Sequence, residues 1–344
     1  MHKSIVPVEI EGAPEEEFEE SIDVGAEDAS KDRRPKKGGT SIITNGELKG
    51  KDLITAINEN PNAILGKKVN EKYQGKLPLL VKFIDAKRDL SIQVHPNDEM
   101  AMREHGKMGK SEMWYVIKAD EDAHLYAGFK QEITPYEYQK RIADGSITNV
   151  LADHKVKAGD VFYLPAGRVH AICGGILLAE VQQSSDVTYR IFDYNRFGMD
   201  GKPRELHTEL AAQALDYHVE DNYRTGYSEA SNKAVQIIDL PYFSVRVLEV
   251  LKQFHRDLRK YDSFIITMCI EGDCKIRVRS TGEEIFLKQG NSTLIPAAIA
   301  DYDIIPQRGK SRILDAFIDN MDRSITSKVT RFFHLTQKQN QNFE

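Results

Sequence analysis

The chain has 344 residues, of which 40% are hydrophobic and 29% charged, and its formal net charge is -6 at pH 7. A chain of this length can bury a sizeable core and suggests two domains more than one. The acidic balance, together with the lack of an Arg/Lys-rich helix or a zinc-finger spacing, argues against nucleic acid and anionic membranes as partners and leaves small molecules as the expected ligands.

The cysteines and the hydropathy pattern indicate where the protein works. Cys173, Cys269 and Cys274 are an odd number without a paired metal-ligand spacing, which argues against a secreted disulfide framework. No apolar segment lies near the start, and no run is long enough to span a bilayer. The sequence therefore predicts a cytoplasmic enzyme or binding protein.

The first part of the chain has an unusual charge pattern. Residues 11–28 are dominated by carboxylates, and the basic run "KDRRPKK" follows them. Such a segment has too little apolar surface to form a core of its own. We therefore expect residues 1–39 to be an acidic N-terminal segment that is solvated or mobile.

From Thr40 the pattern becomes that of β-strands. The runs "LPLLVKFIDA", "LSIQVHP", "EMWYVIKA" and "HKVKAGDVFYLPAGRVHAI" each predict a strand or a strand, a turn and a second strand. The clearest helical pieces are "PYEYQKRIADG", which starts with proline and ends with glycine, and "HTELAAQALDY". They predict a helical insertion at 135–149 and a helical linker at 199–235.

The two halves of the chain repeat one another. In "GDVFYLPAGRVH" and in "GNSTLIPAAIAD" a proline follows the first glycine by six residues and a polar residue follows the proline by five, with Gly159 and Gly290 offset by 131 residues. Upstream, "EMWYVI" from Glu112 resembles "DSFIIT" from Asp262 at an offset of 150 residues, and the difference of about 19 is close to the length of the helical insertion. The sequence therefore predicts a mainly all-β protein with two related units in tandem, at 40–198 and 236–344.

The stretch "LSIQVHPNDE" raises a question about its polar face. Side chains two residues apart in a strand share a face, so Gln93 and His95 stand side by side. A half-buried strand commonly turns its polar face to water. The stretch alone therefore leaves open whether this face is solvated or belongs to a site.

His170 adds a second imidazole to this question. It follows a Gly-Asp, strand and Pro-x-Gly turn that resembles the second conserved motif of cupins, which are small β-barrels. Gln93, His95, Glu112 and His170 all lie near ends of predicted strands, and two imidazoles with a carboxylate suit Zn²⁺ and leave a position open for water or substrate. The second half has Asp301 at the position of His170 and no equivalent of "QVH", so we expect one metal site, in the first barrel only.

Four ordered blocks carry a closer resemblance. "LSIQVHP", "GKSEMWYVI", "GDVFYLPAGRVHAI" and "VQQSSDVTYRIFDYNR" resemble consecutive blocks of the short bacterial form of type I mannose-6-phosphate isomerase, a family of zinc-dependent double-cupin enzymes. The resemblance runs from Thr40 to the end and is strongest between Lys76 and Arg196. It implies two cupin-type β-barrels in tandem and one Zn²⁺, or another divalent metal, per chain. The metal ligands that it implies are Gln93, His95, Glu112 and His170.

The resemblance also implies a reaction, the interconversion of mannose 6-phosphate and fructose 6-phosphate through a cis-enediol. Arg190 matches the active-site arginine, whose planar fork suits a phosphate or a developing oxyanion. Lys110 would add a positive charge beside that oxygen or contact phosphate, and Asp186 is a candidate for proton handling. Without the resemblance, Lys110 would be read as a surface lysine, and Asp186 with Arg190 as a structural ion pair.

Two other functions remain open at this point. A noncatalytic double-cupin protein would hold a sugar phosphate without converting it, although it would not need the full set of ligands with Arg190, Asp186 and Lys110. An iron-dependent cupin oxidoreductase fits less well, because such sites typically use more histidines. We expect a sugar phosphate as the small-molecule partner and a monomer or homodimer as the assembly.

Overall fold

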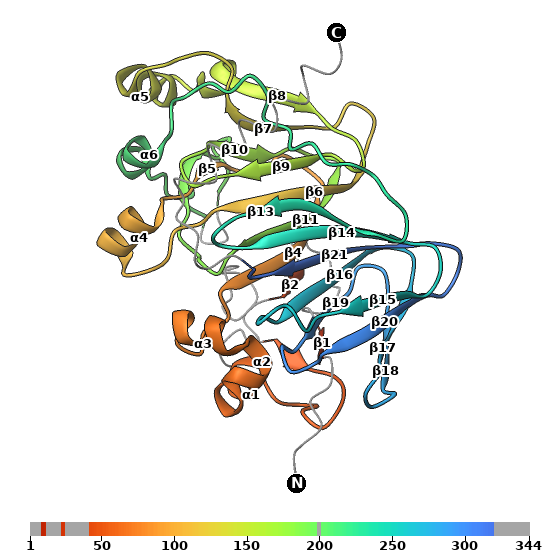
Figure 1. Ribbon diagram of the computed structural model, residues 1–344. Helices are drawn as coiled ribbons and strands as arrows, with labels where there is room; N and C mark the ends of the chain where they lie inside the picture. The colour runs from red at the N-terminus through yellow and green to blue at the C-terminus, as the bar shows by residue number, and fades with distance from the viewer. Residues whose placement is uncertain (1–7, 12–21, 25–40, 198–200, 320–344) are drawn as a thin grey trace.

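The protein consists of two β-barrels that lie side by side, with one sheet of each facing the other (Figure 1). The structure is a computed structural model and describes residues 8–11, 22–24, 41–197 and 201–319. Each barrel is built from two antiparallel sheets that enclose an apolar cluster and a few buried charged residues. Among these described residues, no helix is both long and apolar enough to cross a membrane.

The first barrel has a sheet on the side of the helices and a sheet near the middle of the molecule. The helix-side sheet has the order β12-β5-β10-β7-β8, and the first central sheet has the order β2-β4-β11-β6-β9. The strands are β2 (Ile22–Val24), β4 (Leu79–Ala86), β5 (Ile92–Val94), β6 (Glu112–Ala119), β7 (His124–Phe129), β8 (Leu151–Lys155), β9 (Val161–Leu164), β10 (His170–Ile172), β11 (Ile176–Gln183) and β12 (Tyr189–Phe192).

The second barrel has a larger central sheet and a small end sheet. The second central sheet has the order β13-β14-β21-β16-β19-β1-β3, and the end sheet has the order β15-β20-β17-β18. The strands are β1 (Val8–Glu11), β3 (Ile42–Ile43), β13 (Ala234–Asp239), β14 (Ser244–Val250), β15 (Phe254–Asp257), β16 (Ile265–Glu271), β17 (Cys274–Val278), β18 (Glu284–Leu287), β19 (Ser292–Ile295), β20 (Asp301–Pro306) and β21 (Ser311–Phe317).

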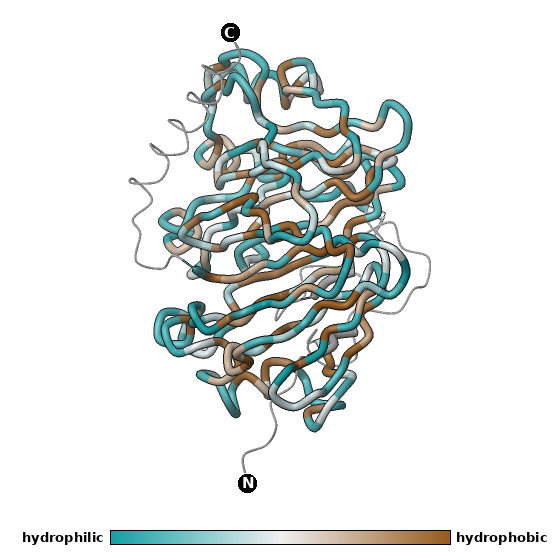
Figure 2. Tube along the Cα trace, turned by 45° about the vertical axis from the view of Figure 1, so that its right-hand side comes forward, coloured by the Kyte–Doolittle hydropathy of each residue, from teal (hydrophilic) through white to brown (hydrophobic). Residues whose placement is uncertain are grey.

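The two central sheets pack face to face and join the barrels. Val81 and Met113 from the first barrel share one buried cluster with Ile266 and Leu314 from the second. Because side chains alternate along a strand, the opposite faces of the same strands line the barrel interiors. The apolar stretches of the chain accordingly run through the central strands, and the hydrophilic ones lie mainly in the connecting loops (Figure 2).

The repeat of the turn is visible in the structure. β9 and β19 each follow a glycine with positive φ, Gly159 and Gly290, and β10 and β20 begin at His170 and Asp301. The upstream offset of 150 residues was wrong, because Leu164 pairs with Glu112 whereas Ile295 pairs with Ile265. Ile265 therefore holds the register position of Glu112, at an offset of 153 residues, and the first unit is correspondingly longer between these strands.

Helices cover the outer faces of the barrels. The expected insertion contains α5 (Pro135–Ala143) and the 3₁₀ helix η1 (Ile147–Val150), and Thr134 caps α5 by accepting from the main-chain N–H of Glu137 at 3.1 Å. With α4 (Asp98–His105) and α6 (Thr208–Ala214), α5 packs on the outer face of the helix-side sheet. In the linker expected at 199–235, α6 is the one helix among residues 201–235, so that segment is mostly irregular rather than helical.

Three helices before β4 were not predicted. They are α1 (Leu53–Glu59), α2 (Pro61–Leu65) and α3 (Lys67–Tyr73). The N-terminal cap Asp52 and the proline at the first position of α2 are ordinary start signals, and the apolar residues of α1 follow helical spacing. These signals were not used, because strands were expected from Thr40 onward.

The same helices dock on the second barrel. The Asp262 carboxylate accepts from the main-chain N–H groups of Lys67 and Lys68, at 2.8 Å and 2.9 Å, at the start of α3. The main-chain N–H groups of Ala297 and Ala298 donate to carbonyls of α2. Segments almost 200 residues apart in the sequence are thereby held together.

Part of the expected N-terminal segment is structured. β1 pairs with β19 of the second barrel, and β2 pairs with β4 of the first. The other residues of the segment 1–39 lie outside the described ranges.

The close approach at Gly66 generates a stability prediction. Gly66 has φ 94° and ψ 152°, and a Cβ there would lie 2.4 Å from the main-chain oxygen of Asp262. We expect Gly66→Ala to lower the free energy of unfolding by about 3 kcal/mol, because it combines backbone strain with a collision. Gly50→Ala is the matched control: Gly50 has φ 84° with no atom within 4 Å of the added Cβ, and about 1 kcal/mol is expected. Equal losses in guanidinium denaturation would contradict the collision.

Candidate metal centre

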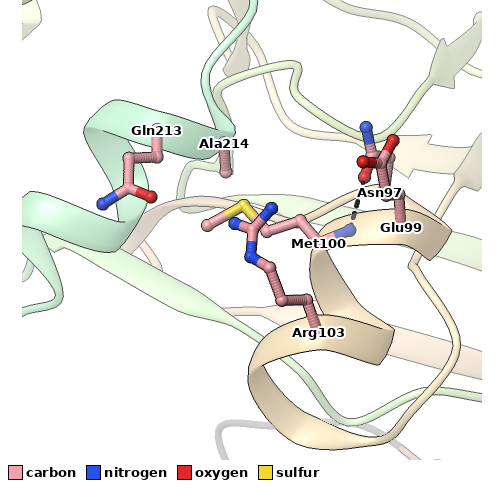
Figure 3. A pocket seen from close by; sticks show the side chains of 6 residues that line it. All are labelled: Asn97, Glu99, Met100, Arg103, Gln213 and Ala214. Carbon is pink, nitrogen blue, oxygen red and sulfur yellow. Dashed lines mark hydrogen bonds between the residues drawn. The ribbon is translucent and has the colours of Figure 1, made fainter.

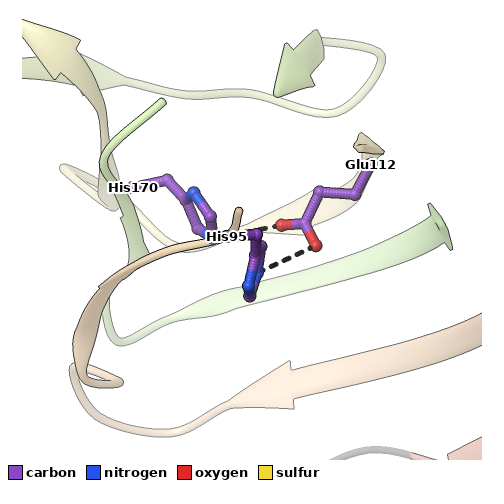
Figure 4. A group of neighbouring side chains, drawn as sticks. All are labelled: His95, Glu112 and His170. Carbon is purple, nitrogen blue, oxygen red and sulfur yellow. Dashed lines mark ion pairs between the residues drawn. The ribbon is translucent and has the colours of Figure 1, made fainter. Parts of the chain in front are cut away.

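Three strands of the first barrel bring two imidazoles and a carboxylate together. His95 directly follows β5, Glu112 is the first residue of β6, and His170 is the first residue of β10. Their side chains are almost completely buried, and one ligand atom from each lies within 4.8 Å of the others (Figure 4). We call these three residues the His–Glu–His group.

Main-chain hydrogen bonds fix the ends of these strands. The Gly167 N–H, in the turn before β10, donates to the His95 carbonyl at 2.8 Å, and the Lys110 N–H donates to the Pro96 carbonyl at 3.1 Å. Gly167 has φ 93° and a Cβ there would lie 3.0 Å from the Ala214 carbonyl, so glycine is required in this turn. The three side chains are therefore held by main-chain geometry as well as by packing.

Each imidazole is oriented by its second nitrogen. His95 Nδ1 lies 3.0 Å from the Val187 carbonyl oxygen, and His170 Nδ1 lies 2.8 Å from that of Arg168. A carbonyl only accepts, so both Nδ1 atoms carry the proton when the rings are neutral. The Nε2 lone pairs then face Glu112, at 3.4 Å from Oε2 for His95 and 3.2 Å from Oε1 for His170. This is the arrangement that orients histidine ligands in metal sites.

The electrostatics of the group keep both imidazoles neutral. Burial and the nearby charge of Lys110 lower the pKa of His95 to about 3, and burial lowers the pKa of His170. Burial raises the pKa of Glu112, but the positive charge of Lys110 opposes this, and the pKa lies below its usual value. Two neutral nitrogen donors therefore face an ionised carboxylate, which is the protonation state that metal ligands need.

The group fits a cation by a second criterion. His95 Nε2, His170 Nε2 and both carboxylate oxygens of Glu112 are buried and have no hydrogen-bond partner among the described residues. Buried polar atoms are nearly always satisfied, and four such atoms converging on one point are the expected lining of an ion site. Two nitrogen donors and a carboxylate suit Zn²⁺ and related divalent metals.

Gln93 and Arg190 lie in one row with His170. In the helix-side sheet Gln93 pairs with His170 on one side and with Arg190 on the other. Tyr189 and Ile191, the neighbours of Arg190, belong to the outer cluster under the helices, so Arg190 shares the inward face with Gln93. The polar stripe of "LSIQVHP" therefore faces the barrel interior rather than the solvent.

Lys110 is buried within the same interior. Its exposed fraction is 5%, and its Nζ lies 3.6 Å from Oε2 of Glu112. Burial lowers the pKa of the ammonium group. The reading of Lys110 as a surface lysine was therefore wrong.

Asp186 lies in a different environment from Lys110. Its side chain is 37% exposed, and both carboxylate oxygens accept from Lys107 Nζ at 2.6 Å. Arg190 Nη1 instead donates to the Glu205 carbonyl at 3.1 Å. The ion pair of Asp186 is thus formed with Lys107, on the surface.

The interior holds charged residues that the sequence analysis missed. Lys82 Nζ lies 3.1 Å from Glu180 Oε2 and donates to Gln182 Oε1 at 3.1 Å. Trp114 Nε1 donates to Glu180 Oε1 at 3.0 Å, and the Trp114 ring meets that of His170 edge to face. The signal was present: Lys82 in "LLVKFIDA", and Glu180 and Gln182 two residues apart in "ILLAEVQQ", interrupt strands that are mainly apolar.

The second barrel lacks these ligands at the matching positions. Asp257 pairs with Asp301 as Gln93 pairs with His170, and Ile265 holds the position of Glu112. Two residues after Asp257, where the first barrel has His95, stands Arg259, which forms an exposed ion pair with Asp257. Within the described residues, the His–Glu–His group is the one cluster of this kind.

A pocket of about 230 Å³ lies between α4 and α6 (Figure 3). It is lined by Asn97, Glu99, Met100, Arg103, Gln213 and Ala214. None of the site residues expected from the sequence lines it. The pocket is therefore a surface feature beside the helices and not the interior site.

Fold and site together define a double-cupin protein with one buried group that could hold a metal ion. The family model described as the catalytic domain of type I phosphomannose isomerase matches residues 36–131, and the cupin-domain model of mannose-6-phosphate isomerase matches residues 233–314.

Relatives with known names agree with these models. The chain is 34% identical over 272 residues to mannose-6-phosphate isomerase ManA of Bacillus subtilis, covering 78% of this chain and 83% of that one. It is 31% identical over 265 residues to the mannose-6-phosphate isomerase of Streptococcus mutans, covering 77% and 81%. The crystal structure of the mannose 6-phosphate isomerase from Bacillus subtilis superimposes with a TM-score of 0.76 at 29% identity, over 90% of this chain and 99% of that one. The chain belongs to the type I mannose-6-phosphate isomerase family and is an isomerase.

The geometry of the group predicts which substitutions abolish metal binding. We expect the wild-type chain to bind one divalent metal ion and His95→Ala and His170→Ala to retain less than about a tenth of it, since each removes one of the few strong donors. His218→Ala, at an exposed histidine, is the matched control and should keep the wild-type metal content. Elemental analysis of the purified proteins after dialysis measures this. Full metal content in either buried variant would show that the ligands lie elsewhere.

Proposed function

We propose that the protein interconverts mannose 6-phosphate and fructose 6-phosphate at the His–Glu–His group, with Zn²⁺ as the metal. The observation that carries the proposal is the convergence of four buried, unsatisfied donor atoms on one point, in a row that continues through Gln93 to Arg190. Membership in the isomerase family supports the reaction class, and the names of the relatives supply the substrate.

The charges of the interior favour an anionic substrate. Lys82 and Lys110 are matched by Glu180 and Glu112, so these four buried residues carry no net formal charge. A divalent cation and the guanidinium of Arg190 would make the site strongly positive. A phosphate monoester carries about -1.5 to -2 charges near pH 7 and offsets this excess.

In this proposal His95, Glu112 and His170 hold the metal, and the amide oxygen of Gln93 is the fourth ligand. A bound divalent metal supplies Lewis-acid polarisation of the substrate's carbonyl and hydroxyl oxygens, which stabilises the enediolate. The neighbouring Trp114 and the apolar walls exclude water, so charge interactions inside the barrel are stronger than at the surface.

The other residues act on the sugar phosphate directly. Arg190 binds the phosphate or the oxyanion that develops on the sugar, because its planar donors match either group. Lys110 places a second positive charge beside the site. A proton leaves C2 of the aldose while the C1 oxygen is protonated, which gives the cis-enediol, and a proton is then added at C1 while the C2 hydroxyl loses its proton. The atoms and electrons balance, so the reaction needs no added oxidant or reductant.

Asp186 is kept as the candidate for proton handling, but its ion pair with Lys107 would have to open for this role. Zinc as the physiological metal, a cytoplasmic location and a monomeric or homodimeric assembly likewise stay predictions.

Chelation tests the proposed function directly. We expect purified protein to form fructose 6-phosphate from mannose 6-phosphate, to lose this activity after treatment with a chelator, and to recover it when zinc is added. Full activity after verified removal of the metal would refute the metal-dependent mechanism. An inactive protein that binds mannose 6-phosphate with its metal in place would instead support the noncatalytic alternative.

Removing Arg190 separates catalysis from metal binding. We expect Arg190→Ala to retain the metal but to lower kcat about 100- to 1000-fold, since a donor to the developing charge is lost. Arg259→Ala, at an exposed ion-paired arginine of the second barrel, is the control and should keep wild-type rates. Unchanged turnover in Arg190→Ala would exclude the proposed role.

A further inference from the structure

β12 lies at the edge of the helix-side sheet, and one residue of the linker closes that edge at Arg190. The sheet order places β5 on one side of β12 only. The Arg190 main-chain N–H donates to His207 Nδ1 at 3.1 Å, and the His207 main-chain N–H donates to the Arg190 carbonyl at 2.8 Å. A single residue therefore binds both main-chain polar groups of Arg190.

The same segment also binds the guanidinium. Arg190 Nη1 donates to the Glu205 carbonyl at 3.1 Å, two residues before His207. The main chain and the side chain of Arg190 are thus both bonded to residues 205–207. These contacts restrict the position of the guanidinium, because residues 205–207 bind both the main chain of Arg190 and the end of its side chain.

His207 is an unusual residue for its position. It is the N-terminal cap of α6, and the Ala211 N–H donates to its carbonyl at 2.8 Å. Serine, threonine, aspartate and asparagine are preferred at such positions because their side chains bond the free N–H groups of the first turn. The His207 ring makes no such bond and points to β12 instead. Departures from local preference of this kind concentrate at functional sites.

We propose that His207 is a positioning residue for Arg190 in the isomerase reaction. It fixes the strand that carries the guanidinium and so sets the distance of the guanidinium from Gln93 and His170, the next members of its row. The inference rests on the proposed function, in which Arg190 contacts the sugar phosphate. His207 does not itself contact substrate in this role.

The proposed role depends on Nδ1 of the ring. Some substitutions of His207 keep an acceptor at the position of Nδ1, and others remove it. Nδ1 accepts the hydrogen bond, and the side-chain oxygen of asparagine lies at the same distance from the backbone as Nδ1. The oxygen of glutamine lies one carbon farther out, near the place of Nε2. His207→Asn should therefore keep the bond, whereas His207→Gln and His207→Ala should lose it.

The experiment measures kcat, KM for mannose 6-phosphate, metal content and Tm for these variants. We expect His207→Ala and His207→Gln to lower kcat about 10-fold or more at unchanged metal content, because small misplacements of a substrate-contacting group are costly. His207→Asn should stay within about 3-fold of wild type. Equal losses in all three variants, or losses that follow Tm alone, would overturn the positioning role. If the alanine variant does not fold, the comparison of the asparagine and glutamine variants decides.

A double-mutant cycle identifies the residue through which His207 acts. If His207 works through Arg190, adding His207→Ala to Arg190→Ala should change kcat less than about 2-fold. If the loss of kcat in the double variant equals the product of the losses in the two single variants, the proposal is overturned.

Failure of the proposed function can be told apart from failure of this inference. If wild-type protein does not isomerise mannose 6-phosphate, the same variants and cycle are measured by calorimetric binding of mannose 6-phosphate. A selective, non-additive loss of affinity supports the positioning of Arg190, and additive or equal losses refute it.

Discussion

A carboxylate with no exposed surface, Glu112, is the constraint on which the first barrel depends. An ionised group buried in an apolar interior costs several kcal/mol unless charges or hydrogen bonds compensate it. Here Lys110, two residues away, supplies a positive charge at 3.6 Å, and the neutral imidazoles of His95 and His170 complete a donor set at which a bound cation would supply the remaining compensation. The end of β5 and the starts of β6 and β10 must therefore lie close together, and the turn at Gly167 makes this possible. The group that could hold a metal is a consequence of this one buried charge.

The second barrel also buries a carboxylate, but it compensates the charge with residues of the protein. Arg256 and Asp315 form a buried ion pair at 2.6 Å, and Thr267 donates to the same carboxylate at 2.8 Å. By register, Asp315 faces Thr267 as Glu180 faces Trp114 in the first barrel. One polar position has thus been kept in both units, but in the second its partner is an arginine of the protein itself. This unit contributes one face to the central core, and its described residues hold no second group like the His–Glu–His group.

The sequence permitted the double-cupin fold to be predicted, together with three polar side chains that the structure brings close to one another. His95, Glu112 and His170 were found because each lies in a short block with a recognisable turn or strand beside it. Lys82 and Glu180 each interrupt an apolar strand pattern, but their ion pair arises from long-range strand pairing, which the pattern of a single strand does not report. The offset at Glu112 failed for a related reason: Ile265, rather than Asp262, is in register, and register is set by neighbouring strands. Helices α1 to α3 had local signals that were outweighed by the expectation of strands.

The docking of α2 and α3 on the second barrel has a consequence for how the protein is made. Ala297 and Ala298 donate main-chain hydrogen bonds to Ile64 and Ala63, and Phe264 donates to Leu65. The ribosome delivers the N-terminal helices long before it delivers these partners. The strands of the first barrel between β4 and β12 precede these partners in the chain, but α2 and α3 cannot dock until residues 262–298 have been synthesised. Docking of these helices on the second barrel is therefore a late event in synthesis, which follows the release of residues 262–298 from the ribosome.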